Sequence, residues 1–330
     1  MTLLADARVL VTGGAGFVGG ALVHRLVESG ARVTVLDDLS AGRATNVPVG
    51  ATLITGSVAA PETVRELVDE HALILHLAAR GIVASTRNPR EDFETNVAGT
   101  LNVLLAAREA NIDRIVYVSS ASVYGNPRTV PINEDDLHVP LSPYAVSKLS
   151  GEHYALAFYE SYGVPVAVVR YSNVYGPGQR PDNPYSGVVT KFLAAALEQR
   201  PLSVHGDGQQ TRDFTFVDDA VDATLLAATH PRAEGEVFNV GTGIETSVLE
   251  LTRAIERLLG VEAELEHVDR RDIDNIRRRV MNIEKARRML RWAPQVALDV
   301  GLRRTADHFG FGSDALEPKT PRYPDSRALS

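Results

Sequence analysis

The sequence predicts an α/β fold, in which a doubly wound parallel sheet is followed by a smaller, mixed C-terminal lobe. Short apolar runs alternate with amphipathic stretches from residue 8 to about residue 175, which is typical of strands joined by crossover helices. The apolar runs are nearly continuous, as in parallel strands that helices cover on both faces. The expected strands are residues 8–11, 32–36, 52–55, 72–77, 114–118 and 164–170. The expected helices are residues 21–27, 62–70, 93–110 and 144–162.

The pattern changes after residue 175, where Pro and Gly become too frequent for regular structure. We therefore expect residues 1–175 to form the first domain and residues 176–310 to form mainly the second lobe. The last segment, 311–330, carries three Pro, mixed charge and few apolar residues, so it is expected to be a mobile tail.

The bulk composition excludes several functional classes. The 330 residues are 44% hydrophobic and 23% charged, as in ordinary soluble domains, and no apolar run approaches the roughly 20 residues of a membrane helix. The N-terminus lacks a signal peptide, and the absence of cysteine excludes disulfides and thiolate metal sites, so we expect a cytoplasmic protein. A net charge of −8 argues against general nucleic-acid binding. The nine His show no metal-ligand spacing, so no metal is expected.

The first strand leads into a glycine-rich loop with the spacing Gly13-x-x-Gly16-x-x-Gly19. The loop lies between a strand and a helix, the context in which such glycines bind a pyrophosphate at a helix N-terminus. Asp37 ends the second strand about twenty residues later, where an acid binds the adenosine ribose diol. Because Asp would repel a 2′-phosphate, the pattern predicts a Rossmann fold that binds NAD. A glycine turn with a capping Asp is the alternative interpretation.

The helix expected from residue 144 carries a Tyr and a Lys one turn apart. Ser142 is the expected N-cap and Pro143 the first helical residue. Tyr144 then lies in the first turn, with Lys148 on the same face. The ammonium and the helix dipole would stabilise a phenolate, so Tyr144 is a candidate general base. An incidental Tyr/Lys pair on an amphipathic helix is the alternative.

Further motifs follow in order along residues 8 to about 293. They are Gly13/Gly16/Gly19, Asp37, His76-Leu77-Ala78-Ala79, Asn96-Val97-Ala98-Gly99-Thr100, Ser120, Tyr144/Lys148, Arg170-Tyr171-Ser172-Asn173-Val174-Tyr175-Gly176-Pro177, Gly206-Asp207-Gly208 and Thr211-Arg212-Asp213-Phe214. In these motifs the sequence resembles the short-chain dehydrogenase/reductase superfamily, in its extended branch of NAD-dependent nucleotide-sugar epimerases and dehydratases.

The resemblance implies a role for each matching residue. Tyr144 would be the base, Lys148 would hold the nicotinamide ribose, and Ser120 would bind the sugar hydroxyl and relay its proton. The residues implied to contact NAD are Gly13, Gly16, Phe17, Val18, Gly19, Asp37, Asp38, Ser57, Val58, Leu77, Ala78, Ala79, Asn96, Tyr144, Lys148 and Tyr171. The residues implied to contact a UDP-sugar are Ser120, Asn173, Arg180, Gly187, Val188, Ser203, His205, Arg212, Asn275 and Arg278. For Arg278, a solvated charge run is the alternative.

The residues that follow Ser120 indicate the reaction. Ala121 and Ser122 stand where the 4,6-dehydratases carry an Asp-Glu pair, and Ser122 stands where sugar decarboxylases carry Glu. Because elimination of water needs extra acid and base groups, the sequence resembles the UDP-sugar 4-epimerases most. Such an enzyme oxidises C4, lets the 4-keto sugar turn in the pocket and reduces it again, so NAD stays bound.

Arg180 bears on the choice of sugar. Its loop resembles that of UDP-glucuronate 4-epimerases, in which a guanidinium could pair with a C6 carboxylate. Conversion of UDP-glucuronic acid to UDP-galacturonic acid is therefore the first choice. The segment 183–188 instead resembles hexose epimerases, and Ala84 replaces an Arg of the uronate enzymes. UDP-glucose, or an N-acetylated hexose, is therefore the runner-up, and a solvent-facing Arg180 is the alternative.

Two other functional classes stay open. A catalytically idle, NAD-sensing protein on the same fold would need only the nucleotide loop, so the presence of Ser120, Tyr144 and Lys148 argues against it. A net reductase would consume free NADH. The resemblance also implies a homodimer, formed by the helices that begin at Phe93 and Tyr144.

Overall fold

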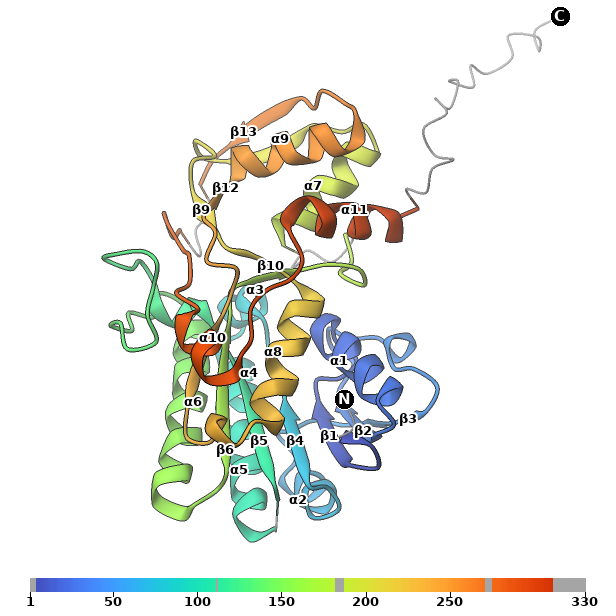
Figure 1. Ribbon diagram of the computed structural model, residues 1–330, viewed down its shortest axis with the longest axis vertical. Helices are drawn as coiled ribbons and strands as arrows, with labels where there is room; N and C mark the ends of the chain where they lie inside the picture. Colours follow the sequence, from blue (N-terminus) through green and yellow to red (C-terminus); the bar gives the residue numbers. More distant parts are fainter. Residues whose placement is uncertain (1–3, 111, 182–186, 271–274, 311–330) are drawn as a thin grey trace, which may run out of the picture.

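A parallel sheet of seven strands lies at the centre of the computed structural model, which describes residues 4–110, 112–181, 187–270 and 275–310 (Figure 1). Every neighbouring pair of strands in this sheet is parallel. From one edge to the other, the strands are β11 (Val237–Val240), β6 (Val166–Tyr171), β5 (Arg114–Ser120), β4 (Leu73–His76), β1 (Arg8–Thr12), β2 (Arg32–Asp37) and β3 (Ala51–Thr55). The predicted doubly wound α/β fold is thereby confirmed.

Two hydrophobic clusters lie on the two faces of the sheet. Alternate residues of a strand point to opposite faces, so Val9 and Val11 pack in one cluster while Leu10 packs in the other. The first cluster contains α1 (Phe17–Glu28) and α8 (Val217–Thr229), and the second contains α2 (Pro61–Asp69), α5 (Gly99–Glu109) and α6 (Pro143–Tyr162). Helices therefore cover both faces, which explains why the central strands are largely apolar.

Strand β11 was not expected from the sequence. It pairs with β6 in the register Val237↔Val168 to Val240↔Tyr171, so the sheet takes a strand from beyond residue 175. The apolar segment that forms β11 is short, and only its pairing with β6 distinguishes it from other short apolar segments of the chain. The functional division into residues 1–175 and, mainly, 176–310 stays a prediction.

The smaller lobe lies beyond the C-terminal ends of the central strands (Figure 1). It contains three two-stranded sheets: β7 (Asn173–Tyr175) with β10 (Phe214–Phe216), β9 (Thr211–Arg212) with β12 (Thr246–Ser247), and β8 (Leu202–His205) with β13 (Leu265–Val268). The remaining helices beyond residue 175 are α7 (Val188–Leu197), α9 (Val248–Leu259), α10 (Glu284–Leu290) and α11 (Leu298–His308). Within the described ranges, no helix is long and apolar enough to cross a membrane. The tail expected at 311–330 lies outside the described residues.

The prediction of a single α-helix over residues 93–110 is wrong for its first turns. After α3 (Ile82–Arg87) and α4 (Pro89–Asp92), residues Phe93–Ala98 form a π-helical segment, and α5 follows it. A π-helical segment has wider turns than an α-helix and often lies at a functional site. This segment contains Asn96, whose contacts are described below.

Candidate active site

The glycine loop joins β1 to α1 and packs closely against the end of β4. Gly13 has a φ of +73°, and a Cβ there would lie 2.7 Å from the backbone nitrogen of Ala78. At Gly19 a Cβ would lie 2.1 Å from the carbonyl oxygen of Gly13. Gly16 is the N-cap of α1 and supplies no side-chain cap, so the helix N-terminus is open to an anionic ligand. This backbone arrangement fits the pyrophosphate of a dinucleotide.

Asp37 connects the end of β2 to this loop. Its side chain is 8% exposed; one carboxylate oxygen accepts from the backbone N–H of Ala15 at 2.9 Å and the other from that of Leu39 at 2.8 Å. Burial raises the pKa of Asp37, and the two backbone donors oppose that shift. Each oxygen has a second lone pair, so the carboxylate fits the two hydroxyls of a ribose.

A pocket of about 120 Å³ lies next to Asp37. It is lined by Gly13, Gly16, Leu36, Asp37, Asp38, Ser40, Ala41, Gly42, Gly56, Ser57, Val58, Leu77, Ala78, Ala79, Arg80 and Thr95. The structure therefore brings most of the residues expected around the adenosine half of NAD to one place. Phe17 and Val18 lie beside it, half-buried in the first turn of α1.

Arg80 is a pocket residue that the sequence reasoning missed. Its guanidinium is bonded to the carboxylates of Asp38, at 2.9 Å, and Glu91, at 2.7 Å, and it also donates to the hydroxyl of Ser40. In the sequence, only its position directly after Leu77-Ala78-Ala79 pointed to the pocket. The contacts with Asp38 and Ser40 depend on the fold.

The predicted catalytic helix, α6, begins as expected. The hydroxyl of Ser142 accepts from the backbone N–H of Ala145 at 3.2 Å, and Pro143 is the first helical residue. Tyr144 is half-buried in the first turn. Lys148 is 3% exposed, and its Nζ donates to the carbonyl oxygen of Val118 at 2.8 Å. This bond fixes the Lys side chain against β5.

Burial changes the electrostatics of this region. It lowers the pKa of Lys148 to about 8, and the carboxylate of Asp92 opposes that shift. Burial and the charge of Lys148 lower the pKa of His76 to about 3. The imidazole of His76 is hydrogen-bonded to Thr12 at 2.7 Å and to Thr100 at 2.9 Å, so it stays neutral and links β4 to its neighbours.

Ser120 ends β5 at the same edge of the sheet. It is half-buried and caps a short turn, Ala121–Tyr124, by accepting from the backbone N–H of Ser122 at 3.2 Å. Its partner across the sheet is Tyr171, the last residue of β6. The hydroxyl of Tyr171 is hydrogen-bonded to the hydroxyl of Thr224 in α8 at 2.5 Å. The expected cofactor contact of Tyr171 would therefore be made by its backbone and ring.

Asn96 holds the backbone of the loop that carries Leu77, Ala78 and Ala79. Its Oδ1 accepts from the N–H of Arg80 at 2.7 Å, and its Nδ2 donates to the carbonyl oxygen of the same residue at 3.1 Å. Nδ2 also donates to Ser147 of α6 at 3.0 Å. Asn96 thus supports the expected cofactor pocket through the backbone.

The expected substrate residues are spread over the smaller lobe and its junction with the sheet. Asn173 in β7 and Arg180 after it are half-buried, and Gly187 is the N-cap of α7, which starts at Val188. In β8, Ser203 is exposed and lies 3.5 Å from Glu266, while His205 is bonded to the carbonyl oxygen of Asp269 at 2.8 Å. Residues 183–186, part of the segment that resembled hexose epimerases, lie outside the described residues.

Arg212 and the segment around Arg278 lie near each other. Arg212 donates to the carbonyl oxygen of Ile276 at 2.9 Å. Arg278 is exposed and forms an ion pair of 2.6 Å with Glu245. Asn275, next to Ile276, is exposed. Glu245 therefore already neutralises the charge of Arg278 in this structure.

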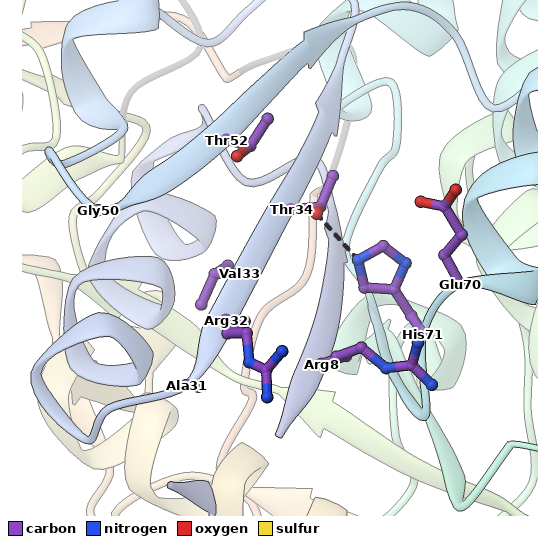
Figure 2. Close-up of a pocket in the computed structure, with 9 residues that line it drawn as sticks. All are labelled: Arg8, Ala31, Arg32, Val33, Thr34, Gly50, Thr52, Glu70 and His71. Atoms are coloured by element: carbon purple, nitrogen blue, oxygen red, sulfur yellow. Dashed lines mark hydrogen bonds between the residues drawn. The ribbon is translucent and has the colours of Figure 1, made fainter. Parts of the chain in front are cut away.

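A larger hollow lies at the opposite edge of the sheet. It measures about 620 Å³ and is lined by Arg8, Ala31, Arg32, Val33, Thr34, Gly50, Thr52, Glu70 and His71 (Figure 2). His71 points toward Thr34 and bonds its hydroxyl at 2.9 Å. Because these residues lie where β1, β2 and β3 begin, the hollow is remote from the C-terminal edge at which doubly wound folds bind ligands. Among the described residues, no group of three His, Cys, Asp or Glu could hold a metal ion.

Comparisons with known proteins agree with this geometry. Residues 9–241 match the family described as NAD dependent epimerase/dehydratase. A UDP-glucose 4-epimerase of Mycolicibacterium smegmatis is 40% identical over 310 residues, which cover 92% of this chain and 98% of that protein.

Two solved structures are also similar. The UDP-glucose 4-epimerase of Thermotoga maritima, crystallised with UDP-glucose, superposes with a TM-score of 0.88 at 35% identity, covering 92% of this chain and 98% of that one. The UDP-glucuronic acid 4-epimerase of Bacillus cereus, in complex with UDP-glucuronic acid and NAD, gives a TM-score of 0.83 at 29% identity, covering 92% and 99%.

Proposed function

This chain belongs to the NAD dependent epimerase/dehydratase family, and from that premise we propose that it interconverts UDP-sugars that differ in configuration at C4. The observation that carries the proposal is the arrangement at the C-terminal edge of the sheet. Ser120 ends β5, Lys148 is buried and bonded to Val118 of the same strand, and Tyr144 lies one turn before Lys148. All three therefore lie on β5 and on α6, the helix that packs against this strand.

The chain's own residues would move the proton of the C4 hydroxyl. Tyr144 accepts it, through or beside Ser120, and the Lys148 ammonium stabilises the resulting phenolate charge. When bound, NAD supplies the oxidising power, taking up and returning the hydrogen of C4. Gly13, Gly16 and Asp37 would hold the cofactor in place, and because the return of the hydrogen to C4 regenerates NAD, the reaction would consume none.

The residues after Ser120 support epimerisation over dehydration. Ala121 is 2% exposed and Ser122 is 8% exposed, and neither side chain is an acid or a base at neutral pH. Elimination of water would need both. Reversible oxidation at C4 needs only Tyr144, Ser120 and the cofactor.

Residues of the smaller lobe would bind the rest of the substrate. Arg212 can neutralise the diphosphate, and the backbone at Asn173 can contact it. Gly187, Val188, Ser203 and His205 would surround the uridine, with Asn275 and Arg278 at its far side. The pairing of β7 with β10 and of β8 with β13 would fix the positions of Asn173, Ser203 and His205.

For the sugar, our first proposal remains UDP-glucuronic acid, converted to UDP-galacturonic acid. Arg180 supports it, because a half-buried guanidinium in the loop after β7 could pair with the C6 carboxylate. UDP-glucose, or its N-acetylated form, is the second candidate. The 40% identity with a UDP-glucose 4-epimerase favours it.

We also propose a homodimer. Phe93, Leu105, Val146 and Tyr154, on the π-helical segment, α5 and α6, are 58%, 37%, 50% and 42% exposed. Four large apolar side chains on neighbouring helices suit a contact between two copies.

The test of the reaction is a screen of UDP-sugars with the purified protein, resolved by chromatography. Formation of the C4 epimer, from either direction and without added NAD, is the expected result. Stoichiometric loss of added NADH would instead indicate a reductase. Bound NAD without turnover of any UDP-sugar would favour the NAD-sensing alternative.

A further inference from the structure

We propose that Asp92 is a positioning residue that holds the catalytic helix and the cofactor loop together and supplies the counter-charge for Lys148. The inference rests on the proposed function. Asp92 ends α4, is 2% exposed, and directly precedes the π-helical segment. It was not a candidate from the sequence.

One oxygen of Asp92 accepts hydrogen bonds from three different elements. The donors are the hydroxyl of Ser85 in α3, the Nδ2 of Asn96 in the π-helical segment at 2.7 Å, and the hydroxyl of Ser147 in α6 at 3.1 Å. A buried carboxylate needs such donors, because a buried charge without hydrogen-bond partners strongly destabilises the folded state. The three side chains are therefore held at fixed distances from one another.

Two of these donors lead to the active site. Asn96 holds both backbone groups of Arg80, at the end of the loop that lines the cofactor pocket. Ser147 lies between Tyr144 and Lys148 in sequence, and its hydroxyl also contacts the carbonyl oxygen of Tyr144 at 3.0 Å. Through these two residues, Asp92 sets the position of the Tyr144 turn relative to the cofactor loop.

The charge of Asp92 acts on Lys148 as well. The groups that face or neighbour Lys148 are Tyr117 of β5, 5.1 Å from Nζ to the ring centre, His76 of β4, and Tyr144 and Glu152 of α6. His76 is neutral, and Glu152 is paired with Arg170 inside the core. The carboxylate of Asp92 opposes the lowering of the Lys148 pKa, so it favours the ammonium that the phenolate of Tyr144 requires.

Asp92→Asn tests the charge while keeping the shape of the side chain. We expect the alkaline limb of kcat/KM for the UDP-sugar to move to lower pH by about one unit, because Lys148 loses its counter-charge. Activity at pH 8 should then fall roughly five-fold, with a smaller loss at pH 6.5. An unmoved limb with a uniform loss of rate would make Asp92 merely structural and would overturn the proposal.

Two serine variants test the positioning and keep it testable should Asp92→Asn not fold. Ser147→Ala breaks the link to α6 and should lower kcat several-fold with the alkaline limb unmoved. Ser150→Ala, the matched control, removes a hydroxyl of the same helix that donates only to the carbonyl oxygen of Val146, at 2.9 Å, and should leave kcat within about two-fold. Equal effects of the two variants would overturn the positioning role.

A readout independent of turnover separates this inference from the proposed function. The dissociation constant of NAD, measured by calorimetry on protein freed of cofactor, should rise about three- to ten-fold in Asp92→Asn and less than two-fold in Ser150→Ala. Absence of UDP-sugar turnover in the wild-type protein would refute the proposed function alone. Unchanged NAD affinity in Asp92→Asn would refute the role of Asp92 whatever the substrate.

Discussion

The ammonium nitrogen of Lys148 donates a hydrogen bond of 2.8 Å to the backbone carbonyl oxygen of Val118. Val118 belongs to β5, the strand that ends at Ser120. The bond therefore fixes the Lys side chain relative to Ser120 through a short stretch of rigid strand. Because a buried ammonium without an acceptor would be costly, this position is set by the protein itself, before a ligand binds.

Lys148→Met should change how stability depends on pH. Unfolded chains keep the Lys proton up to a pH near 10.5, whereas the folded protein releases that of Lys148 at about 8. Between these values the unfolded state binds more protons, so this group makes the free energy of unfolding rise with pH, and below pH 8 its contribution is constant. The NAD-free variant lacks this ammonium. As the pH rises from 7 to 10, its free energy of unfolding should therefore increase less than that of the wild type, by roughly 3 kcal/mol at most.

Urea unfolding of both NAD-free proteins at pH 7 and pH 10 measures this difference. A stability gap that is the same at the two pH values would contradict the shifted pKa of Lys148.

Tyr144→Phe should remove the proton acceptor and keep the packing of the ring. We expect kcat to fall by roughly 10² to 10⁴, with NAD still bound. Tyr162→Phe, at the exposed end of the same helix, is the matched control and should retain wild-type activity. Near wild-type turnover of the Tyr144 variant would rule out this residue as the base.

Asp37→Ala should weaken NAD binding by about 1–3 kcal/mol, the scale of a lost charge-assisted hydrogen bond. The control is Asp113→Ala. Asp113 is an exposed acid that directly precedes β5, at the N-terminal ends of the strands and away from the glycine loop. Calorimetry gives the affinities, and the cofactor released on denaturation of the wild type identifies the dinucleotide. Release of NADP in place of NAD would refute the assigned role of Asp37.

Arg180→Ala should discriminate between the two candidate sugars. If the guanidinium pairs with a C6 carboxylate, kcat/KM for UDP-glucuronic acid should fall roughly 30-fold or more, because breaking a buried charged pair costs about 2–5 kcal/mol. UDP-glucose, with a neutral C6 hydroxyl, should change little. Arg200→Ala, an exposed arginine paired with Glu198, is the control.

The ratio of the two losses decides the role of Arg180. An equal loss for both sugars would make it a contact to the diphosphate. Unchanged rates for both would leave it a surface residue, and UDP-glucose would become the preferred substrate.

Gly151→Ala should push α6 away from β5. A Cβ at Gly151 would lie 2.3 Å from the hydroxyl oxygen of Tyr117, which itself donates to the carbonyl oxygen of Lys148 at 3.1 Å. Overpacking of this kind costs about 1–3 kcal/mol, so Tm should fall, and kcat should fall with it because Lys148 moves. Adding Tyr117→Phe removes the nearest clashing atom and should restore part of both losses; a double variant no better than Gly151→Ala would argue against this contact.

Local patterns were enough to predict the fold class and the motifs of the site. Continuous apolar runs indicated parallel strands, the spacing Gly13, Gly16, Gly19 indicated the phosphate loop, and Tyr144 with Lys148 followed from one turn of a capped helix. Each of these depends on neighbours within a few residues along the chain, where backbone sterics and helical periodicity decide the geometry.

Only the tertiary structure decided the rest. It placed β11 beside β6, Arg80 in an ion pair with Asp38, and Asp92 in contact with both Asn96 and Ser147. The pairing of a buried polar group depends on which distant segments pack around it. A sequence records that such a residue is charged, whereas its partners, its burial and hence its role are set when the whole chain excludes water from that place.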